Sequence, residues 1–326
     1  MSNHLHTSLT AALQQFFANK PFHKSNVLQS LWSGYGEIAR YEDKQGRSVI
    51  VKWVAPEQGG ANHPRGWNTS LSHARKLSSY YNERLFYQHY ASQTSNTCKV
   101  PEFIAADRRG DDSWLLMQDL DASGYFIRQP RLSMAVIKNG LTWLAHFHAQ
   151  FVQCNCAELW PIGSYWHLET RPDEWHAMAE SHLKRQARAI DDKLKMAKFK
   201  TLLHGDAKIA NFCFSEDLER LAAVDFQYAG RGVGVIDLMY FLGSCLDDEQ
   251  LEQHAEMLLA YYFEILAVAC EGRMQAVDIK LLIIEWRELY CFAWADFERF
   301  LSGWSPGHHK LTSYSLLQTQ LALSQL

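Results

Sequence analysis

Three polar residues in one segment of the sequence have the types and spacing needed for phosphoryl transfer. Asp206 precedes Asn211 by five residues in the run His-Gly-Asp-Ala-Lys-Ile-Ala-Asn, and Asp225 directly follows the apolar residues 221–224. Phosphoryl-transfer enzymes use an Asp, an Asn and a second Asp in this order as one base and two metal contacts. Magnesium prefers hard oxygen ligands and keeps several waters, so these few contacts suffice. A purely structural role in turns would suit any one of the three, but not all three in this order.

Lys52 lies at the end of the buried-looking strand sequence Val-Ile-Val-Lys. A lysine in that position loses hydration unless an anion compensates it, and a phosphate or a carboxylate would do so. Glu83, in a predicted helix further along the chain, is the obvious carboxylate. Taken alone, a surface Lys52 and a solvated Glu83 would be the simpler interpretation. Because both precede the Asp206 segment, we favour a Lys52–Glu83 pair that faces nucleotide phosphates.

The segment around Asp206 resembles the catalytic segment of a family of small-molecule kinases. His204, Gly205 and Asp206, followed by Asn211, are similar to the His-Gly-Asp-x-x-x-x-Asn of the aminoglycoside phosphotransferase and choline kinase group, where protein kinases have His-Arg-Asp. The resemblance implies a bilobal protein-kinase-like fold and the use of ATP and Mg2+. It implies that Asp206 orients a substrate hydroxyl and accepts its proton, and that Asn211 and Asp225 hold magnesium.

The resemblance extends to the residues expected around the nucleotide. It implies that Lys52, positioned by Glu83, neutralises phosphate charge. Gly34 and Gly36 stand where this fold places a phosphate-covering loop, although hairpin turns use glycine for conformational reasons alone. The family's adenine-lining hinge, which acts through backbone groups, falls on Met117, Gln118 and Leu120.

Further residues are expected to support the catalytic loop from behind. We interpret His148 and His204 as organisers of this loop rather than as bases. Asp237 is predicted to open a helix and cap its N–H groups, and by resemblance it braces the loop. Gln227 stands where protein kinases have the glycine of Asp-Phe-Gly, and the short link to Asp237 leaves no room for an activation segment. Residues 163–174 are similar to a subgroup of ecdysteroid-kinase-like or uncharacterised bacterial members of this group.

The elements that must position these residues follow from hydrophobic periodicity and turn signals. In the first third of the chain we expect helices at residues 5–19 and 77–92, strands at 27–32, 37–42 and 48–54 with a hairpin turn at 43–46, and a strand pair between 100 and 117. The remainder is mainly helical, with long helices at 132–151, 173–188, 249–271 and 276–301. This predicts an α+β fold with a β-rich nucleotide-binding N-lobe (1–119) and a helical C-lobe (120–326) that carries the catalytic loop and the metal and acceptor sites.

Composition limits the class of partner. The 326 residues carry a net charge of −4, with 47% hydrophobic and 21% charged residues, which predicts an ordinary globular protein without attraction to nucleic acid. The most apolar helical stretch, 257–270, is interrupted by Glu264 and too short to span a bilayer. Seven scattered cysteines suit reduced thiols, so we expect a cytoplasmic protein. The oligomeric state is left open.

The acceptor is the least determined part of the prediction. The mixture of aromatic and acidic residues in 285–298 would suit a cationic amine, but the helical spacing of its aromatic residues favours a core stripe. We expect Glu285, Asp296 and Glu298 to face water. Trp304 is a better candidate than these helix residues for lining a pocket. The function predicted is ATP-dependent phosphorylation of a small-molecule hydroxyl on an amino alcohol, aminoglycoside, sugar or sterol-like compound. The alternative is a kinase-like protein that binds nucleotide without turnover.

Overall fold

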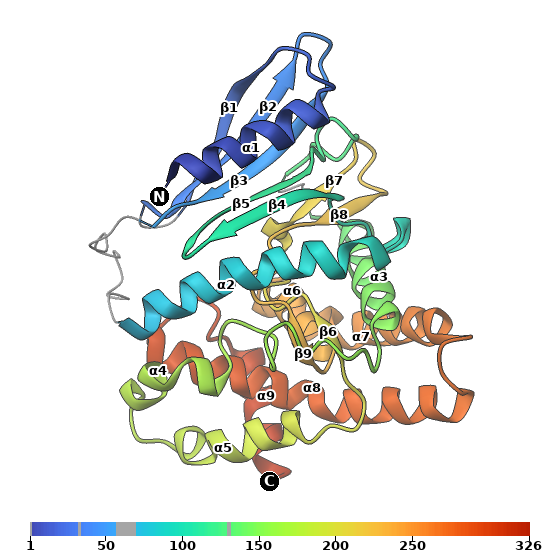
Figure 1. Cartoon of the computed structure of the whole chain (residues 1–326). Helices are drawn as coiled ribbons and strands as arrows, with labels where there is room; N and C mark the ends of the chain where they lie inside the picture. Colours follow the sequence, from blue (N-terminus) through green and yellow to red (C-terminus); the bar gives the residue numbers. More distant parts are fainter. Residues whose placement is uncertain (1, 32–33, 57–69, 129–131) are drawn as a thin grey trace.

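The computed structural model describes residues 2–31, 34–56, 70–128 and 132–326. A β-sheet region and a helical region follow each other along the chain and lie one above the other in space (Figure 1). This arrangement confirms the predicted α+β class. Residues 57–69, most of the Gly- and Asn-containing stretch that follows the third strand, lie outside the described residues.

Five antiparallel strands form the N-terminal sheet, in the order β1-β2-β3-β5-β4. They are β1 (Phe22–Ser30), β2 (Gly36–Asp43), β3 (Ser48–Val54), β4 (Phe103–Arg109) and β5 (Asp112–Gln118). The predicted hairpin joins β2 to β3. Its turn is held by Asp43, whose Oδ1 accepts hydrogen bonds from the backbone N–H groups of Gln45 at 2.8 Å and Arg47 at 3.1 Å.

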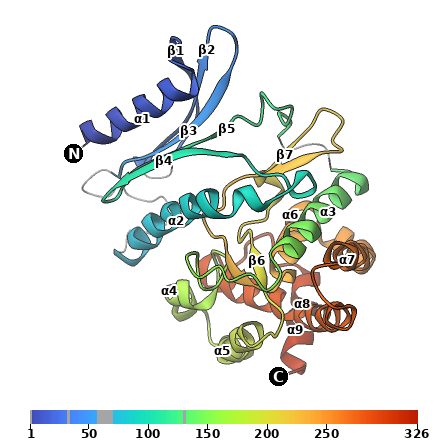
Figure 2. The ribbon, with the colours of Figure 1, turned by 45° about the vertical axis from the view of Figure 1, so that its right-hand side comes forward.

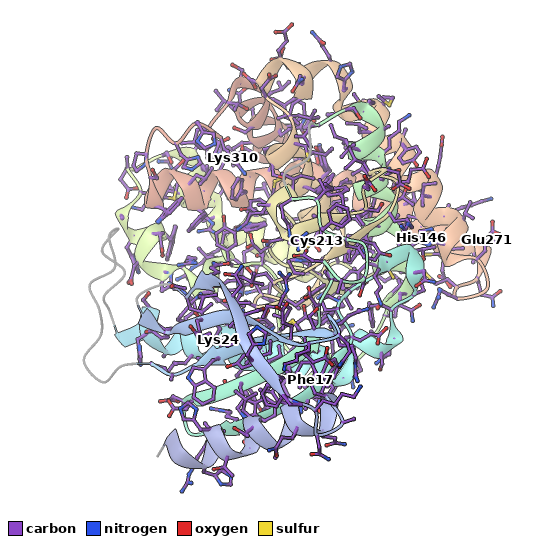
Figure 3. All side chains as sticks on the ribbon, turned by 90° about the horizontal axis from the view of Figure 1, so that it is seen from above. Phe17, Lys24, His146, Cys213, Glu271 and Lys310 are labelled. Atoms are coloured by element: carbon purple, nitrogen blue, oxygen red, sulfur yellow. The ribbon has the colours of Figure 1, made fainter. Side chains whose placement is uncertain are left out.

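One helix covers each face of the sheet (Figures 1 and 2). Helix α1 (Ser2–Phe16) packs with its apolar side on Val49 and Val51 of β3, and Phe17, labelled in Figure 3, extends that contact. Successive side chains of a strand point to opposite faces. Ile50 accordingly belongs to the core on the other face, where helix α2 (Ser70–His89) lies. The same alternation turns Lys52 toward α2.

The C-terminal region consists of helices around two short strand ladders. The helices are α3 (Met134–Gln150), α4 (Pro172–Ala177), α5 (His182–Lys195), α6 (Val235–Cys245), α7 (Asp248–Cys270), α8 (Ala276–Trp304) and α9 (Ser313–Ser324). Strand β6 (Thr201–Leu203) pairs with β9 (Gly230–Gly232), and β7 (Phe212–Phe214) pairs with β8 (Leu221–Ala223). The segment that carries Asp206 and Asn211 runs from β6 to β7, and Asp225 follows β8. The ladders therefore bring the three predicted site residues toward one place.

Three predicted elements differ from the structure. The helix expected at 173–188 is two helices, α4 and α5, because Met178 is extended and the Ser181 side chain caps the start of α5 by accepting from the Lys184 N–H. Strand β1 begins before residue 27 and is exposed along almost its whole length, so no alternation of hydrophobicity marks it. Helix α2 begins ahead of residue 77.

The core joins both regions of the chain. One cluster of buried hydrophobic residues includes Ile50 and Leu115 of the sheet, Phe86 of α2 and Phe147 of α3. The predicted lobe boundary after residue 119 lies just past β5 and stays a prediction. None of the helices that the structure describes is long and apolar enough to cross a membrane. All seven cysteines are free.

Candidate active site

Asp206 lies buried in the loop between β6 and β7. Its Oδ2 accepts hydrogen bonds from Lys208 Nζ at 2.9 Å and from Asn211 Nδ2 at 3.1 Å, and Asn211 Nδ2 also donates to the backbone oxygen of Asp206 at 2.8 Å. Its Oδ1 is buried and has no hydrogen-bond partner among the described residues. Burial raises the pKa of Asp206, and the positive charge of Lys208 opposes that rise. The site thus holds a carboxylate with one oxygen engaged and the other unpartnered.

Gly205, immediately before Asp206, has no sterically allowed replacement. Its φ is +80°, and a Cβ at this position would lie 2.0 Å from the carbonyl oxygen of Tyr228. A left-handed backbone and this close approach both require glycine. The His-Gly-Asp sequence, in place of the His-Arg-Asp of protein kinases, is therefore a consequence of how closely residues 204–206 pack against Tyr228.

Asp237 supports the loop from behind. Its carboxylate accepts hydrogen bonds from the backbone N–H groups of His204 at 2.6 Å and Gly205 at 3.0 Å, and lies 3.2 Å from Nε2 of His148. The expectation that Asp237 caps a helix is wrong, because α6 begins at Val235 and the Asp237 carboxylate is turned toward the loop instead. The expectation that it contacts the loop agrees with these bonds.

The two histidines link the loop to its surroundings. The ring of His204 lies 3.0 Å from the carbonyl oxygen of Val224, directly before Asp225, and its Nδ1 accepts from the Asp206 N–H at 3.3 Å. His148 is fully buried and its Nδ1 lies 2.7 Å from the Tyr262 hydroxyl. Both rings connect polar groups of the loop and its neighbours, which supports the interpretation as organisers.

We expect Asp237→Asn to destabilise the protein by about 3 kcal/mol, because an amide N–H2 group replaces one of the two oxygens that each accept from a backbone N–H, which leaves buried groups unsatisfied. Urea denaturation of the variant and the parent measures the change. Asp192→Asn, at an exposed position of α5, is the matched control and should change the free energy of unfolding by less than about 0.5 kcal/mol. Equal stability of Asp237→Asn and the parent would contradict this account of the loop.

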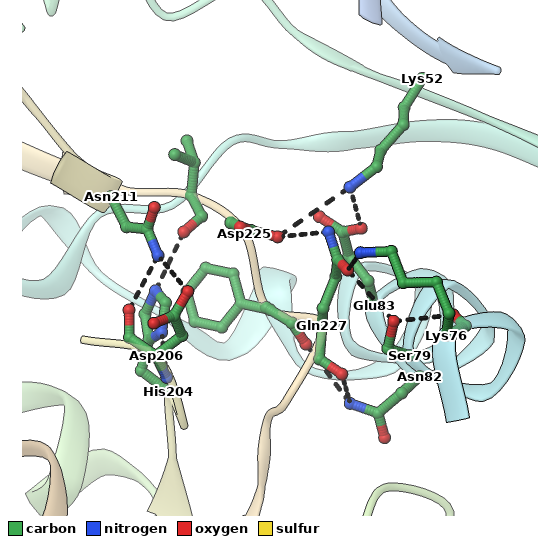
Figure 4. A network of polar contacts seen from close by, with 12 residues as sticks. Lys52, Lys76, Ser79, Asn82, Glu83, His204, Asp206, Asn211, Asp225 and Gln227 are labelled. Carbon is green, nitrogen blue, oxygen red and sulfur yellow. Dashed lines mark hydrogen bonds and ion pairs between the residues drawn. The ribbon is translucent and has the colours of Figure 1, made fainter. Parts of the chain in front are cut away.

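Lys52 and Glu83 form a buried ion pair between β3 and α2 (Figure 4). Lys52 Nζ also lies 4.0 Å from Asp225 Oδ1. Burial raises the pKa of Glu83, and the charge of Lys52 counteracts that rise. The pairing predicted from the sequence is present, and it places the lysine's charge beside Asp225.

Asp225 has a backbone conformation that is unusual for its residue type. Its φ is +70°, in the left-handed region, where a non-glycine residue is uncommon and costs of order 1 kcal/mol. Burial alone would raise the pKa of Asp225, but the positive charges of Lys52, Lys76 and Lys208 outweigh that effect and hold it below its usual value. The carboxylate is therefore kept ionised among three lysines.

Gln227 fastens Asp225 to helix α2 (Figure 4). Its Nε2 donates to Asp225 Oδ1 at 2.6 Å, while its Oε1 accepts from Lys76 Nζ at 3.0 Å and Ser79 Oγ at 3.1 Å. One turn further along α2, Asn82 Nδ2 donates to the carbonyl oxygen of Ala229 at 2.9 Å. Side chains of α2 thus hold residues 225–229 through hydrogen bonds to the Gln227 side chain and to the backbone carbonyl of Ala229.

Lys76 makes the stability of the folded protein depend on pH. Burial lowers its pKa to about 8, and Asp225 only partly compensates. Because the unfolded chain keeps the lysine protonated up to higher pH, the unfolded state binds more protons between about pH 8 and 10.5, and the parent gains stability as pH rises through that window. We expect the parent to gain up to about 1.4 kcal/mol per pH unit there relative to Lys76→Met. Urea denaturation at pH 7.5, 8.5 and 9.5 measures the difference, and parallel profiles would contradict the prediction.

The oxygen atoms of Asn211 and Asp225 fit a magnesium ion that also binds phosphate. Asn211 donates through its amide nitrogen to Asp206, and Figure 4 shows its amide oxygen pointing away from Asp206. The described residues include no group of three or more His, Cys, Asp or Glu that could hold a metal by themselves. Magnesium commonly takes one or two protein oxygens and completes its shell with water and substrate phosphates. The donor set present here suits that mode of binding.

Two solved structures align with nearly the whole chain. One is a protein from Ralstonia eutropha JMP134, provisionally assigned as an aminoglycoside phosphotransferase, with a TM-score of 0.52 and 13% identity over 97% of this chain and 95% of that one. The other is an amicoumacin kinase in complex with AMP-PNP, Ca2+ and Ami, with a TM-score of 0.50 and 13% identity over 98% of this chain and 95% of that one. The chain has the protein-kinase-like fold. This confirms the fold predicted from the His-Gly-Asp segment.

A family model matches part of the protein-kinase-like chain. Residues 163–273 match the model of the ecdysteroid kinase-like family. The matched range includes Asp206, Asn211 and Asp225, and it begins with the stretch 163–174 in which the sequence is similar to that subgroup. No curated protein matches the chain.

Within this protein-kinase-like fold, the predicted nucleotide-contacting residues have structural roles of their own. A Cβ on Gly36 would lie 2.0 Å from the carbonyl oxygen of Trp53, so β2 needs glycine there for its packing against β3. In the predicted hinge, the side chain of Gln118 accepts a hydrogen bond from the Glu102 N–H and donates one to Ser123 Oγ. Contacts of Gly34, Gly36, Met117, Gln118 and Leu120 with a nucleotide remain predictions.

The aromatic residues of α8 belong to the core of the kinase-like fold, as their spacing predicts. Trp286, Tyr290, Trp294 and Phe297 are all buried, and so is Leu301 in the same helical spacing. The expectation that the acidic residues of this helix face water is wrong at two positions, because each has a buried partner. Asp296 pairs with Arg299 at 2.8 Å, and Glu298 accepts from Thr319 Oγ1 at 2.9 Å.

Several residues at the site were missed by sequence reasoning. Lys208, two residues after Asp206, was visible in the catalytic segment and reaches Asp206 directly. Lys76 and Ser79 precede Glu83 by seven and four residues, so helical spacing places all three on one face of α2. That shared face was the available signal. The contact with Gln227, by contrast, joins segments far apart in the sequence.

Proposed function

We propose that the chain is an ATP-dependent kinase that phosphorylates a hydroxyl group of a small molecule. The observation that carries the proposal is the unpartnered buried oxygen of Asp206, next to Lys208 and in the same site as the Lys52–Glu83 pair and Asp225. A carboxylate with one oxygen free of protein hydrogen bonds can accept a hydrogen bond from a substrate hydroxyl. The kinase-like fold and the family match over residues 163–273 support this assignment.

In the proposed reaction, the hydroxyl oxygen forms a bond to the γ-phosphorus of ATP. The bond between that phosphorus and the oxygen bridging the β- and γ-phosphates breaks, ADP leaves, and Asp206 takes the hydroxyl proton. Lys52, positioned by Glu83, neutralises phosphate charge, and Asn211 and Asp225 would hold Mg2+. The ion, when bound, stabilises negative charge on the phosphate oxygens. The chain itself contributes alignment and fixed charges, which are the main sources of catalysis in this reaction class.

Several features support the nucleotide and metal parts of the proposal. The amicoumacin kinase of the same fold was solved with AMP-PNP and Ca2+, a nucleotide analogue and a divalent cation. The lowered pKa of Asp225 keeps an anionic oxygen available for a cation at neutral pH. The free cysteines suit the proposed cytoplasmic location.

A two-stage experiment tests the proposal. Thermal unfolding with ATP and Mg2+ measures nucleotide binding, and ADP release with detection of the phosphorylated product measures transfer across amino alcohols, aminoglycosides, sugars and sterols. We expect stabilisation by the nucleotide with Mg2+ and transfer to at least one class of alcohol. Stabilisation without transfer to any acceptor would reject the enzyme and favour a nucleotide-binding protein without turnover.

A further inference from the structure

We propose that the hydroxyl acceptor carries a carboxylate or another anionic group, and that Lys310 binds it. This inference rests on the proposed kinase function and names the chemical class of its acceptor. The observation behind it is a partly buried lysine that has aromatic neighbours and, among the described residues, no carboxylate within ion-pair distance. The aromatic side chains of Tyr240, Tyr165 and Tyr228 connect it to the loop of Asp206.

Lys310 lies in the connection between α8 and α9 (Figure 3). Its Nζ is 4.7 Å from the centre of the Tyr240 ring and 5.9 Å from that of Phe297. Among the residues that the structure describes, no carboxylate oxygen lies within 4.0 Å of this Nζ. Aromatic rings attract a cation but do not replace an anion, so a desolvated lysine in this setting favours a negatively charged ligand.

The aromatic residues beside Lys310 connect it to the catalytic loop. The hydroxyls of Tyr240 and Tyr165 are 3.0 Å apart, and the ring of Tyr165 lies 5.8 Å from that of Tyr228. The carbonyl oxygen of Tyr228 is the atom that excludes a side chain at position 205, next to Asp206. Burial, Tyr165 and Asp206 together hold the pKa of Tyr240 well above its usual value. A ligand lying along these rings would reach from Lys310 toward Asp206.

Apart from Asp206 itself, whose Oδ2 accepts from Lys208, the acidic groups near these aromatic residues are already paired. Glu174 bonds Arg171 at 3.3 Å, and Asp296 bonds Arg299. Lys208 adds a second positive charge, at 2.9 Å from Asp206. A cationic acceptor such as an amino alcohol would therefore meet lysines here and would have to compete for carboxylates that are already in ion pairs. An anionic alcohol with a flat apolar body matches both the charge and the aromatic surface.

Three benzyl alcohols that differ only in the group para to the hydroxymethyl test the charge preference. They are 4-(hydroxymethyl)benzoate, 4-(hydroxymethyl)benzamide and 4-(aminomethyl)benzyl alcohol, which are anionic, neutral and cationic at pH 7. We expect KM for the benzoate to be at least about tenfold lower than for the benzamide, as for a charge-assisted hydrogen bond, and the cationic alcohol to be the poorest acceptor. Equal KM values, or preference for the cationic compound, would overturn the proposal.

Lys310→Met tests the residue. We expect it to raise KM for the benzoate about tenfold, to the KM of the benzamide, so that selectivity between the two compounds is lost. The matched control is Lys193→Met, which removes an exposed lysine 5.8 Å from the Phe292 ring, at a different place, and should change neither value. Lys310→Gln, which also lacks the charge, replaces Lys310→Met if the latter unfolds. Retained selectivity in a folded variant would overturn the role of Lys310.

A binding measurement separates this proposal from the proposed function. Calorimetry with each of the three alcohols, in the presence of AMP-PNP and Mg2+, requires no turnover. Benzoate binding that is lost in Lys310→Met, without transfer in any assay, would support the anion site and reject the kinase function. Transfer to neutral or cationic alcohols, without preferential benzoate binding, would support the kinase function and reject the anion site. Absence of benzoate binding at millimolar concentration would also reject the anion site.

Discussion

The Asp206→Asn variant should bind ATP with Mg2+ as the parent does and should transfer the phosphoryl group about 10³-fold more slowly. A positioned base contributes about 10²- to 10⁴-fold in reactions that move a proton in the transition state. Asparagine has the shape of aspartate and still offers an oxygen to Lys208 and Asn211. It cannot take a proton from the acceptor hydroxyl, so the loss should appear in kcat rather than in nucleotide affinity.

The same variant should fold at least as stably as the parent at neutral pH. A carboxyl whose pKa is raised in the folded protein binds its proton more tightly there than in the unfolded chain, so the stabilisation is present at low pH and is lost as pH rises through the folded pKa. At pH 7, above the usual pKa of an aspartate, this raised pKa therefore costs stability, and asparagine removes that cost. Thermal unfolding measures this directly.

The matched control for this experiment is Asp217→Asn, which makes the same chemical change at an exposed residue of the turn between β7 and β8. It should leave phosphotransfer unaltered. Full phosphotransfer activity in folded Asp206→Asn would remove Asp206 from the reaction.

Asp225→Asn should abolish the gain in nucleotide affinity that Mg2+ provides, with a loss of more than about tenfold in affinity for the Mg2+ complex. Even the outer-shell partners of a metal typically account for 10- to 100-fold in affinity, and here the variant removes a direct anionic ligand. Asparagine tolerates left-handed backbone better than most residues, so the strained φ of +70° does not confound the result. Thermal shift with ATP, in the presence and absence of Mg2+, gives the comparison.

Lys52→Met serves as the contrasting variant for this prediction. Loss of the lysine should weaken nucleotide binding whether or not Mg2+ is present, because its charge acts on phosphate directly. If Mg2+ still increased the nucleotide affinity of Asp225→Asn, residues other than Asp225 would have to bind the metal.

Local patterns in the sequence were sufficient to predict those features that depend on a single strand, helix or loop. Strand β3 has the predicted bounds because its hydrophobic run ends at turn residues on both sides. The alternation of Ile50 and Lys52 with Val49 and Val51 was enough to predict that the lysine faces a helix. Glu83 lies on that helix. The order of Asp206, Asn211 and Asp225 also sufficed to identify the fold.

Residues whose surroundings come from distant segments could not be predicted in this way. Asp296 and Glu298 look like solvent-facing acids on a helix. Arg299, three residues after Asp296, was visible as a partner, but only the packing of the C-terminal region buries that pair and brings Thr319 of α9 to Glu298. Strand β1 is exposed and exists because β2 pairs with it. Lys310 lies far along the chain from Tyr240, and nothing local indicates that the two meet.

The bond from Gln227 to Asp225 and α2 has a consequence for how such a kinase would be controlled. Many kinases spend much of their time with the metal-binding aspartate or the neighbouring helix displaced, and the fraction of competent molecules then scales their apparent affinity. Here the chain between Asp225 and α6 is too short to hold a switchable segment, and its first residues are tied to the helix that also carries Glu83. In the proposed kinase, these bonds would hold the metal-binding aspartate and the glutamate in one arrangement before substrate arrives, so this segment would not have to become ordered on binding.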